Sequence, residues 1–448
     1  MSLAIIILAA GKGTRMKSAK PKVMHTLAGK PMLQHVIDTA KQLSPSQLAV
    51  VSGNGADEVV PFLQNQQIDV VMQHEQKGTG HAVEQAKASF VNSEQVLVLY
   101  GDVPLITADT LQDLIESGDN NSLKVLTAIL EDPTGYGRIV RDYDDNMLCI
   151  TEEKDADEET KLINEINTGI MCIPAKWLTE ALSQLDNNNT QGEYYLTDLI
   201  AKAVNQGIEI NSVTCEDEME VAGINNRVQL AEVESYYQQL KATELMMSGV
   251  TFRDPARVDI RGDIKAGQDI TIDINVIFEG NNTIADNVSI GANCILINST
   301  IHEGAEILPN SIIENAEVGT NCSVGPFARL RPGTKLAAKA KVGNFVEVKN
   351  ANIGLGSKIN HLSYIGDTDM GADVNIGAGT ITCNYDGANK HRTVIGDRVF
   401  VGSDTQLVAP VTVEDGATIG AGSTIRKTAP ADSLTLTKSE QKTVKGWQ

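Results

Sequence analysis

A glycine-rich loop that carries three basic side chains lies near the start of the chain. The run Leu8-Ala9-Ala10-Gly11-Lys12-Gly13-Thr14-Arg15-Met16 follows a short apolar segment, and Pro21-Lys22 comes shortly after it. Backbone N–H groups in such a loop can surround phosphate oxygens, while Arg and Lys neutralise their charge. It is not a Walker loop, because no Ser or Thr follows a Gly-Lys pair. We expect a phosphate site of another kind, with a tight connecting turn as the alternative.

A carboxylate occurs at a second position that suits phosphate chemistry. The apolar run at residues 95–100 ends in Tyr100-Gly101-Asp102, so Asp102 emerges where a predicted strand stops. Magnesium prefers one or two carboxylates together with water and substrate phosphate oxygens. Asp102 facing the basic loop would suit such an ion, whereas a turn-forming Asp is the alternative.

Strand-like runs alternate with helix-like stretches through the first half of the chain. The strand-like runs cover residues 4–8, 48–52, 69–72, 95–100 and 124–130. This order predicts a doubly wound α/β sheet, in which ligands lie at the carboxyl ends of the strands. The loop and Asp102 both follow predicted strands. Residues 226–247 predict one helix that ends before Gly249 and serves as a linker.

From about Ile264 onward, apolar residues recur every six positions. One series is Val318, Val324, Leu330, Leu336, Val342 and Val348, and another is Ile395, Val401, Leu407, Val413, Ile419 and Ile425. This period predicts a left-handed parallel β-helix in which each flat side takes one hexad. Shorter steps, such as Leu296 to Ile301, indicate corners that have lost one residue.

The six-residue series breaks after Ile376 and resumes only at Ile395. The intervening residues include the run 382–390, and an insertion in a regular solenoid is expected to be functional. The sequence therefore predicts a first domain at 1–226, a helical linker at 227–249, and a repeat domain with a C-terminal arm at 250–448.

The composition restricts partners and compartment. The chain has 37 Lys and Arg against 58 Asp and Glu, a net charge of −21, which repels nucleic acid and anionic membranes. Its six scattered cysteines favour free thiols in a reducing cytoplasm. The apolar start is too short to span a membrane and lacks a basic leader, so neither membrane insertion nor export is expected.

Several motifs together resemble the sugar-phosphate nucleotidyltransferases. They are the opening loop, Gln73, Gly78-Thr79, Tyr100-Gly101-Asp102, Gly135-Tyr136-Gly137-Arg138, Glu152, the run 164–169 and the run 223–227. Joined to a hexapeptide solenoid, they resemble, over nearly the whole chain, a bacterial family with two activities. These are glucosamine-1-phosphate N-acetylation from acetyl-coenzyme A and uridylyl transfer from UTP to N-acetylglucosamine-1-phosphate, which yields UDP-N-acetylglucosamine and pyrophosphate.

For the first site, the resemblance implies a role for each motif. UTP and the N-acetylated sugar would contact Leu8, Ala9, Ala10, Gly11, Arg15, Lys22, Gln73, Gly78, Thr79, Tyr100, Gly101, Asp102, Gly137, Glu152, Asn167 and Asn225. Within this set Gln73 would contact the uracil, and Asp102 with Asn225 would hold Mg²⁺. Direct displacement at the α-phosphorus needs positioning and charge neutralisation rather than a side-chain nucleophile.

For the second site, amide formation needs an unprotonated sugar amine and hence a base that titrates near neutrality. The solenoid has His302 at an ordinary repeat position, His361 just before the insertion, and His391 inside it. A surface role is the alternative for any single one of them. The resemblance implies that His361 is the general base.

The resemblance also implies the ligands of the second site. The sugar phosphate would contact Arg331, Lys349, Tyr364, Asn375 and Lys390, and acetyl-coenzyme A would contact Ala378, Asn384, Tyr385, Ser403, Ala421 and Lys438. The family usually has Arg where Lys438 stands, and Lys cannot pair bidentately with a phosphate. Related acetyltransferases bind the cofactor between the solenoids of a trimer, so a homotrimer is expected.

Two other functions were open on the sequence alone. One is a nucleotidyltransferase with a single activity and a non-catalytic, regulatory β-helix, and the other is a non-catalytic scaffold. His361 and the insertion argue against the first, and two separate phosphate-binding clusters argue against the second.

Overall fold

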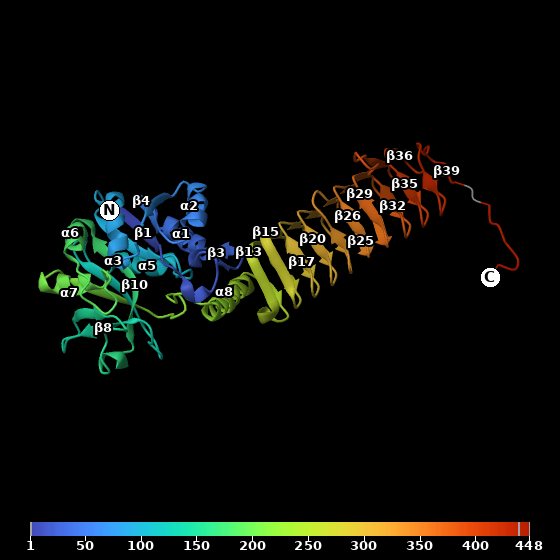
Figure 1. Cartoon of the computed structure of the whole chain (residues 1–448). Coiled ribbons are helices and arrows are strands. Elements are labelled where there is room, and N and C mark those ends of the chain that lie inside the picture. Colours follow the sequence, from blue (N-terminus) through green and yellow to red (C-terminus); the bar gives the residue numbers. More distant parts are fainter. Residues whose placement is uncertain (1, 438–439, 448) are drawn as a thin grey trace. The chain divides into compact units, whose positions relative to one another are not determined.

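The computed structural model describes residues 2–437 and 440–447 (Figure 1). The chain forms two compact units, Met1–Tyr237 and Gln238–Gln448. Helix α8 (Arg227–Met247) contains the point of division, and its Asn226 side chain caps the first turn by accepting from the backbone N–H groups of Val228 and Gln229. No helix in the described ranges is long and apolar enough to cross a membrane.

A mixed sheet forms the centre of the first unit, with strand order β11-β7-β10-β6-β1-β4-β5. Its strands are β1 (Leu3–Ala9), β4 (Gln47–Ser52), β5 (Asp69–Met72), β6 (Gln95–Tyr100), β7 (Leu123–Ile129), β10 (Glu165–Pro174) and β11 (Ile210–Cys215). Five of them match the predicted runs, although β7 ends one residue before the run 124–130 does. Strands β10 and β11 were not predicted. Strand β10 lies antiparallel between β6 and β7, so the sheet is not parallel throughout.

Both faces of this sheet are buried, which explains the continuous apolar run of β1. Ile6 and Leu8 contribute to the core on one face, and Ile5 and Ile7 to the core on the other. The covering helices are α1 (Met32–Gln42), α2 (Ala56–Gln64), α3 (Thr79–Gln85), α4 (Lys87–Phe90), α5 (Ala108–Glu116), α6 (Ala175–Ala181) and α7 (Asp198–Asn205). A hairpin of β8 (Gly137–Arg141) and β9 (Met147–Thr151) extends from β10.

The second unit is a parallel β-helix, as predicted, and it has three sides. It begins at Val250, before the six-residue series can be recognised in the sequence. The first side is one sheet of β12 (Val250–Phe252), β14 (Ile270–Ile272), β16 (Ser289–Ile290), β19 (Glu306–Ile307), β22 (Ser323–Val324), β25 (Lys341–Asn344), β28 (Lys358–His361), β31 (Asn375–Ile376), β34 (Phe400–Val401), β37 (Thr418–Ile419) and β39 (Leu434–Thr435). Strands β13 (Val258–Ala266) and β15 (Val276–Ile284) begin the other two sides.

The second and third sides alternate along the chain. The second side contains β17 (Ile295–Ile297), β20 (Ile312–Glu314), β23 (Arg329–Leu330), β26 (Glu347–Lys349), β29 (Tyr364–Gly366), β32 (Ile381–Cys383), β35 (Gln406–Val408) and β38 (Thr424–Ile425). The third contains β18 (Thr300–Ile301), β21 (Glu317–Val318), β24 (Lys335–Leu336), β27 (Asn352–Ile353), β30 (Thr368–Met370), β33 (Thr393–Ile395) and β36 (Val411–Val413).

The repeated apolar residues of all three sides form one continuous core, because each hexad points one aliphatic side chain inward. The shortened steps, such as Leu296 to Ile301, lie at the corner between the second and third sides. The insertion lies at this same corner, between β32 and β33. This corner therefore varies most in length along the solenoid.

Candidate active sites

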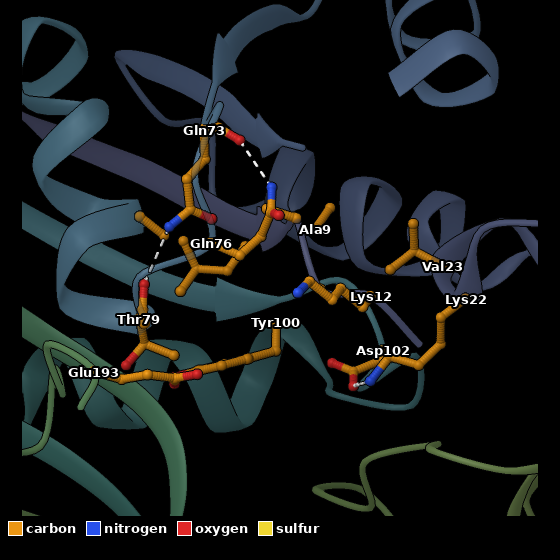
Figure 2. Close-up of a pocket in the computed structure, with 15 residues that line it drawn as sticks. Ala9, Lys12, Lys22, Val23, Gln73, Gln76, Thr79, Tyr100, Asp102 and Glu193 are labelled. Carbon is orange, nitrogen blue, oxygen red and sulfur yellow. Dashed lines mark hydrogen bonds and ion pairs between the residues drawn. The ribbon is translucent and has the colours of Figure 1, made fainter. Parts of the chain in front are cut away.

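A cavity of about 430 Å³ lies at the carboxyl ends of β1 and β6 in the first unit (Figure 2). It brings together these predicted residues: Leu8, Ala9, Ala10, Gly11, Lys22, Gln73, Gly78, Thr79, Tyr100 and Asp102. Figure 2 shows Gln73 and Thr79 at one end of the cavity, and Lys22 with Asp102 at the other. The cavity thus has a mainly uncharged polar end and a charged end.

At the charged end, oxygen atoms of Asp102 and Asn225 face two cationic side chains. The ammonium of Lys22 donates to a carboxylate oxygen of Asp102 and, at 3.1 Å, to Oδ1 of Asn225. Arg15 donates to the same Asn225 oxygen at 2.8 Å. A backbone hydrogen bond from Ile224 N to Asp102 O, 2.9 Å long, holds these two segments side by side. The structure therefore joins four residues that lie far apart in the sequence.

A second group of predicted residues surrounds the base of the β8–β9 hairpin. Gly137 lies against the carboxylate of Glu152, which accepts a hydrogen bond of 2.9 Å from Thr197. Burial raises the pKa of Glu152. Oδ1 of Asn167 accepts from the backbone N–H of Gly169 at 3.0 Å. A partly buried carboxylate with spare acceptor positions suits a ligand that brings hydroxyl donors.

Tyr100 connects this second group to the cavity. Its ring lies against Gly169, where any side chain would clash with it. Burial raises the pKa of the Tyr100 hydroxyl, and the charges of Glu152 and Asp102 add to that effect. Tyr100 therefore keeps its proton at neutral pH, and its hydroxyl lies close enough to Glu152 and Asp102 for their charges to act on it.

Sequence reasoning missed several residues of this site. Gln76 lines the cavity and donates to the backbone oxygen of Gln73 at 3.0 Å. Glu193 also lines the cavity and lies in an irregular segment. The Thr79 hydroxyl holds this segment in place by accepting a hydrogen bond of 3.0 Å from Leu196 N. The sequence has no strand or helix signal that would place Glu193 near the loop.

In the second unit, five residues occupy the same corner position in successive coils. Each lies two positions after a buried residue of the first side, at the corner that leads to the second side. The five residues are Asn344, His361, Ala378, Ser403 and Ala421. We call this set the corner ladder. Backbone hydrogen bonds between the coils hold it together: Leu362 N to Asn344 O at 3.1 Å, Asp404 N to Ala378 O at 2.7 Å, and Gly422 N to Ser403 O at 2.8 Å.

His361 is exposed on this ladder and contacts the coil below it. Its Nδ1 lies 2.8 Å from Oδ1 of Asn344, which can only accept, so the ring proton resides on Nδ1. The Nε2 lone pair is consequently available to a ligand. The other two histidines of the solenoid are bonded to carboxylates, His302 to Glu317 at 3.0 Å and His391 to Asp386 at 2.6 Å.

A basic and polar cluster lies on the second side. Arg331 forms an ion pair of 2.7 Å with Glu347, whose strand partner in the next coil is Tyr364. Lys390 of the insertion lies near Lys349, and its positive charge lowers the pKa of the Lys349 ammonium. Two adjacent ammonium groups repel each other, and an anion bound between them would relieve the repulsion. The cluster therefore suits a phosphate group.

Two aspartates anchor the insertion, Asp367 at the corner before the third side and Asp369 on β30 of that side. Nearly buried Asp367 accepts from the side-chain amides of Asn350 and Asn384. Asp369 pairs with Arg392. Asn384 is only 9% exposed, whereas neighbouring Tyr385 is 61% exposed. Sequence reasoning had not identified Asp367, because its two amide partners come from different coils.

Two predicted residues are not brought into this cluster. Asn375 lies on β31 of the first side, whereas Arg331, Lys349 and Tyr364 lie on the second. Lys438 lies outside the described residues. In the described ranges there is also no group of three or more His, Cys, Asp and Glu side chains placed to hold a metal ion.

The fold and the two clusters define a nucleotidyltransferase joined to a hexapeptide-repeat transferase. Family models agree: a MobA-like NTP transferase domain matches residues 5–193, a GMPPB C-terminal domain matches 260–361, and six bacterial transferase hexapeptide repeats match 392–427. The chain belongs to the GlmU family of bifunctional proteins. This membership confirms the predicted family and the predicted class of enzyme, a bifunctional transferase.

Two curated relatives show how far the similarity extends. The Bifunctional protein GlmU of Marinobacter nauticus is 52% identical over 446 residues, which cover 100% of this chain and 98% of the relative. The protein of the same name from Stutzerimonas stutzeri is 54% identical over 448 residues, which cover 100% and 99%. The similarity therefore includes both units.

Proposed function

We propose that this chain synthesises UDP-N-acetylglucosamine in two reactions. The second unit would transfer the acetyl group of acetyl-coenzyme A to glucosamine-1-phosphate. The first unit would then transfer the uridylyl group of UTP to N-acetylglucosamine-1-phosphate and release pyrophosphate. The observation that carries this proposal is that each unit has its own cationic cluster, Lys22 with Arg15 in one and Lys349 with Lys390 in the other.

In the first unit, the two ends of the cavity suit the two ends of UTP. The charged end, with Lys22 and Arg15, would hold the triphosphate, and the end with Gln73 and Thr79 would hold the uridine. Glu152 and Asn167 would bind the hydroxyl and acetamido groups of the sugar. The sugar-phosphate oxygen then attacks the α-phosphorus, and the bond to pyrophosphate breaks as the new P–O bond forms.

Asp102 and Asn225 fit a divalent cation, because their oxygens both face the ammonium of Lys22 and the Asn225 oxygen also faces Arg15. We propose that they hold Mg²⁺ and that Lys22 then contacts the triphosphate. Bound Mg²⁺ would neutralise charge on the phosphate oxygens. Lys22 and Arg15 would share that task, so the chain supplies positioning and charge rather than a nucleophile.

In the second unit, the sugar phosphate would bind between Lys349 and Lys390, near Arg331 and Tyr364. Nε2 of His361 would take a proton from the sugar amine as its nitrogen attacks the thioester carbonyl. The coenzyme A thiolate then leaves and receives that proton. Asn384, held by Asp367, would donate to the oxyanion.

The upper part of the corner ladder suits an elongated cofactor. Its members above His361 are the small residues Ala378, Ser403 and Ala421, which leave room beside the coil corners. Tyr385 projects from the insertion and is available to the same ligand. We propose that acetyl-coenzyme A lies along this corner with its thioester near His361.

We also propose a homotrimer. Asn375 lies on a different side from the basic cluster, so its predicted contact with a sugar phosphate requires a second copy of the chain. Large exposed apolar residues also occupy one corner position in three successive coils: Phe345 and Leu362 directly after the first two ladder residues, and Phe327 in the coil before them. Their backbones have positive φ values of 56°, 57° and 48°, which are costly for bulky side chains.

Substituting Asn for Phe327 and Phe345 tests this surface without harming the fold. Asn occupies the matching corner at Asn293 and Asn310 with φ values of 60° and 62°, so it accepts this conformation. We expect the double variant to fold and to sediment as a monomer. Leu162→Asp, at an 81% exposed residue of the first unit, is the control and should leave the mass unchanged. A trimeric double variant would contradict the role of this surface.

A coupled assay tests the two activities together. Glucosamine-1-phosphate, acetyl-coenzyme A, UTP and Mg²⁺ are supplied, and N-acetylglucosamine-1-phosphate and UDP-N-acetylglucosamine are followed over time. We expect both to form in that order. Formation of the nucleotide sugar only from added N-acetylglucosamine-1-phosphate would support the nucleotidyltransferase with a regulatory β-helix. The free state of all six cysteines agrees with a cytoplasmic location, which we also propose.

A further inference from the structure

Thr197 lies at the start of α7 but does not cap that helix. Its backbone is already helical, with φ −64° and ψ −23°, whereas a capping threonine adopts an extended backbone. Within the described part of the chain its hydroxyl makes a single hydrogen bond, of 2.9 Å to Oε1 of Glu152, and no capping bond. A carboxylate oxygen accepts, so the Thr197 hydroxyl donates. This buried hydroxyl is therefore committed to a residue of the first site.

The hydrogen bond from Thr197 leaves the second oxygen of Glu152 to a ligand. Among the described residues Oε2 has no hydrogen-bond partner, and it is not one of the buried side-chain atoms that lack one, so it is accessible. It lies beside Gly137, where an added Cβ atom would be 3.5 Å away. A terminal carboxylate torsion is broad, so the carboxylate would turn readily if nothing held it. The bond at Oε1 therefore fixes where Oε2 points.

The charge of Glu152 depends on the same hydrogen bond. Burial raises the pKa of Glu152, and the negative charges of Asp198 and Asp155 raise it further. The hydrogen bond from Thr197 lowers this pKa, because a hydroxyl donor stabilises a carboxylate. Thr197 therefore favours the ionised form of Glu152, in which both oxygens accept.

Thr197 is itself held in place, because the segment before it is bonded to the first turn of α3. The backbone oxygen of Tyr194 accepts from Gly80 N at 2.9 Å. The backbone N–H of Leu196 donates at 3.0 Å to the hydroxyl of Thr79, which lines the cavity (Figure 2). The donor to Glu152 is therefore fixed relative to the cavity.

We infer that Thr197 is a positioning residue of the first site, which orients the carboxylate of Glu152 toward the N-acetylated sugar. This inference rests on the proposed binding of N-acetylglucosamine-1-phosphate beside Glu152 and Asn167. A sugar hydroxyl donates to Oε2 while Thr197 donates to Oε1, so both carboxylate oxygens are paired when the substrate is bound. Thr197 acts through Glu152, so its loss should weaken the binding of the sugar phosphate and not that of UTP.

Thr197→Val removes the hydroxyl and keeps the shape of the side chain. At saturating UTP we expect KM for N-acetylglucosamine-1-phosphate to rise about tenfold, because a hydrogen bond to a carboxylate is lost. KM for UTP should change less than about twofold. Thr197→Ser retains the donor and should keep both KM values. Thr179→Val is the matched control, because the hydroxyl of that helical threonine donates to Ala175 O of its own helix, at 2.8 Å.

A double variant shows whether Thr197 acts through Glu152. When Thr197→Val is added to Glu152→Ala, kcat/KM for N-acetylglucosamine-1-phosphate should fall by less than about twofold, because the acceptor of the hydrogen bond is already absent. A further loss of about tenfold in the double variant would overturn the positioning role. An unchanged KM for the sugar phosphate in Thr197→Val, or an equal rise in both KM values, would overturn it as well.

These outcomes are distinct from a failure of the proposed function, which would appear as absence of UTP turnover in the unaltered protein. Thermal unfolding of each preparation reports on its folding. Thr197→Ala removes the same donor and is measured in parallel, so that a misfolded valine variant does not decide the result.

Discussion

Replacing His361 with alanine should abolish acetyl transfer and leave uridylyl transfer unchanged. Loss of a general base costs about 10²- to 10⁴-fold in rate. His361 is an exposed solenoid histidine whose Nδ1 faces an amide oxygen, so its Nε2 is available to an amine. Acetyl transfer is followed as coenzyme A release with glucosamine-1-phosphate, and uridylyl transfer as pyrophosphate release in the same preparation.

His302→Ala is the matched control for this prediction. His302 lies on the same solenoid, but its imidazole is bonded to Glu317 at 3.0 Å and it lies on no predicted ligand surface. We expect both activities of this variant to match those of the unaltered protein. Full acetylation by His361→Ala would mean that another group accepts the proton.

Replacing Asp102 with asparagine should reduce uridylyl transfer and leave acetyl transfer unchanged, the reverse of the result expected for His361→Ala. The change keeps the shape of the side chain but removes the charge that faces Lys22, so uridylyl transfer should fall roughly 10³-fold. Acetyl transfer should not change, because the residues proposed for it all belong to the second unit. The binding of Mn²⁺, followed by electron paramagnetic resonance, should weaken in parallel.

Asp113→Asn is a suitable control, because Asp113 is an exposed carboxylate on α5. It should retain both activities and the binding of Mn²⁺. Equal loss of acetyl and uridylyl transfer in Asp102→Asn would argue against independent sites. Normal Mn²⁺ binding combined with lost uridylyl transfer would restrict Asp102 to a role in binding substrate.

Much of the fold could be predicted because its signals are local. The apolar run of β1 and the six-residue period each depend on residues close together in the sequence. Strand β10 was missed because Asn167 and Gly169 interrupt its apolar pattern, and the structure has a bulge in the pairing there. An interrupted strand becomes stable only through its neighbours, in this case β6 and β7.

The sequence by itself determined the glycine-rich loop, the solenoid, the insertion and the family, since each is a pattern of residue types at fixed spacing. Only the tertiary structure decided which residues share a surface. His361 and Asn344 are 17 residues apart and meet because one coil of the solenoid has that length at this point. Lys22 and Asn225 are 203 residues apart and meet through backbone pairing near Asp102. Such contacts depend on register and chain crossing, which residue types alone do not specify.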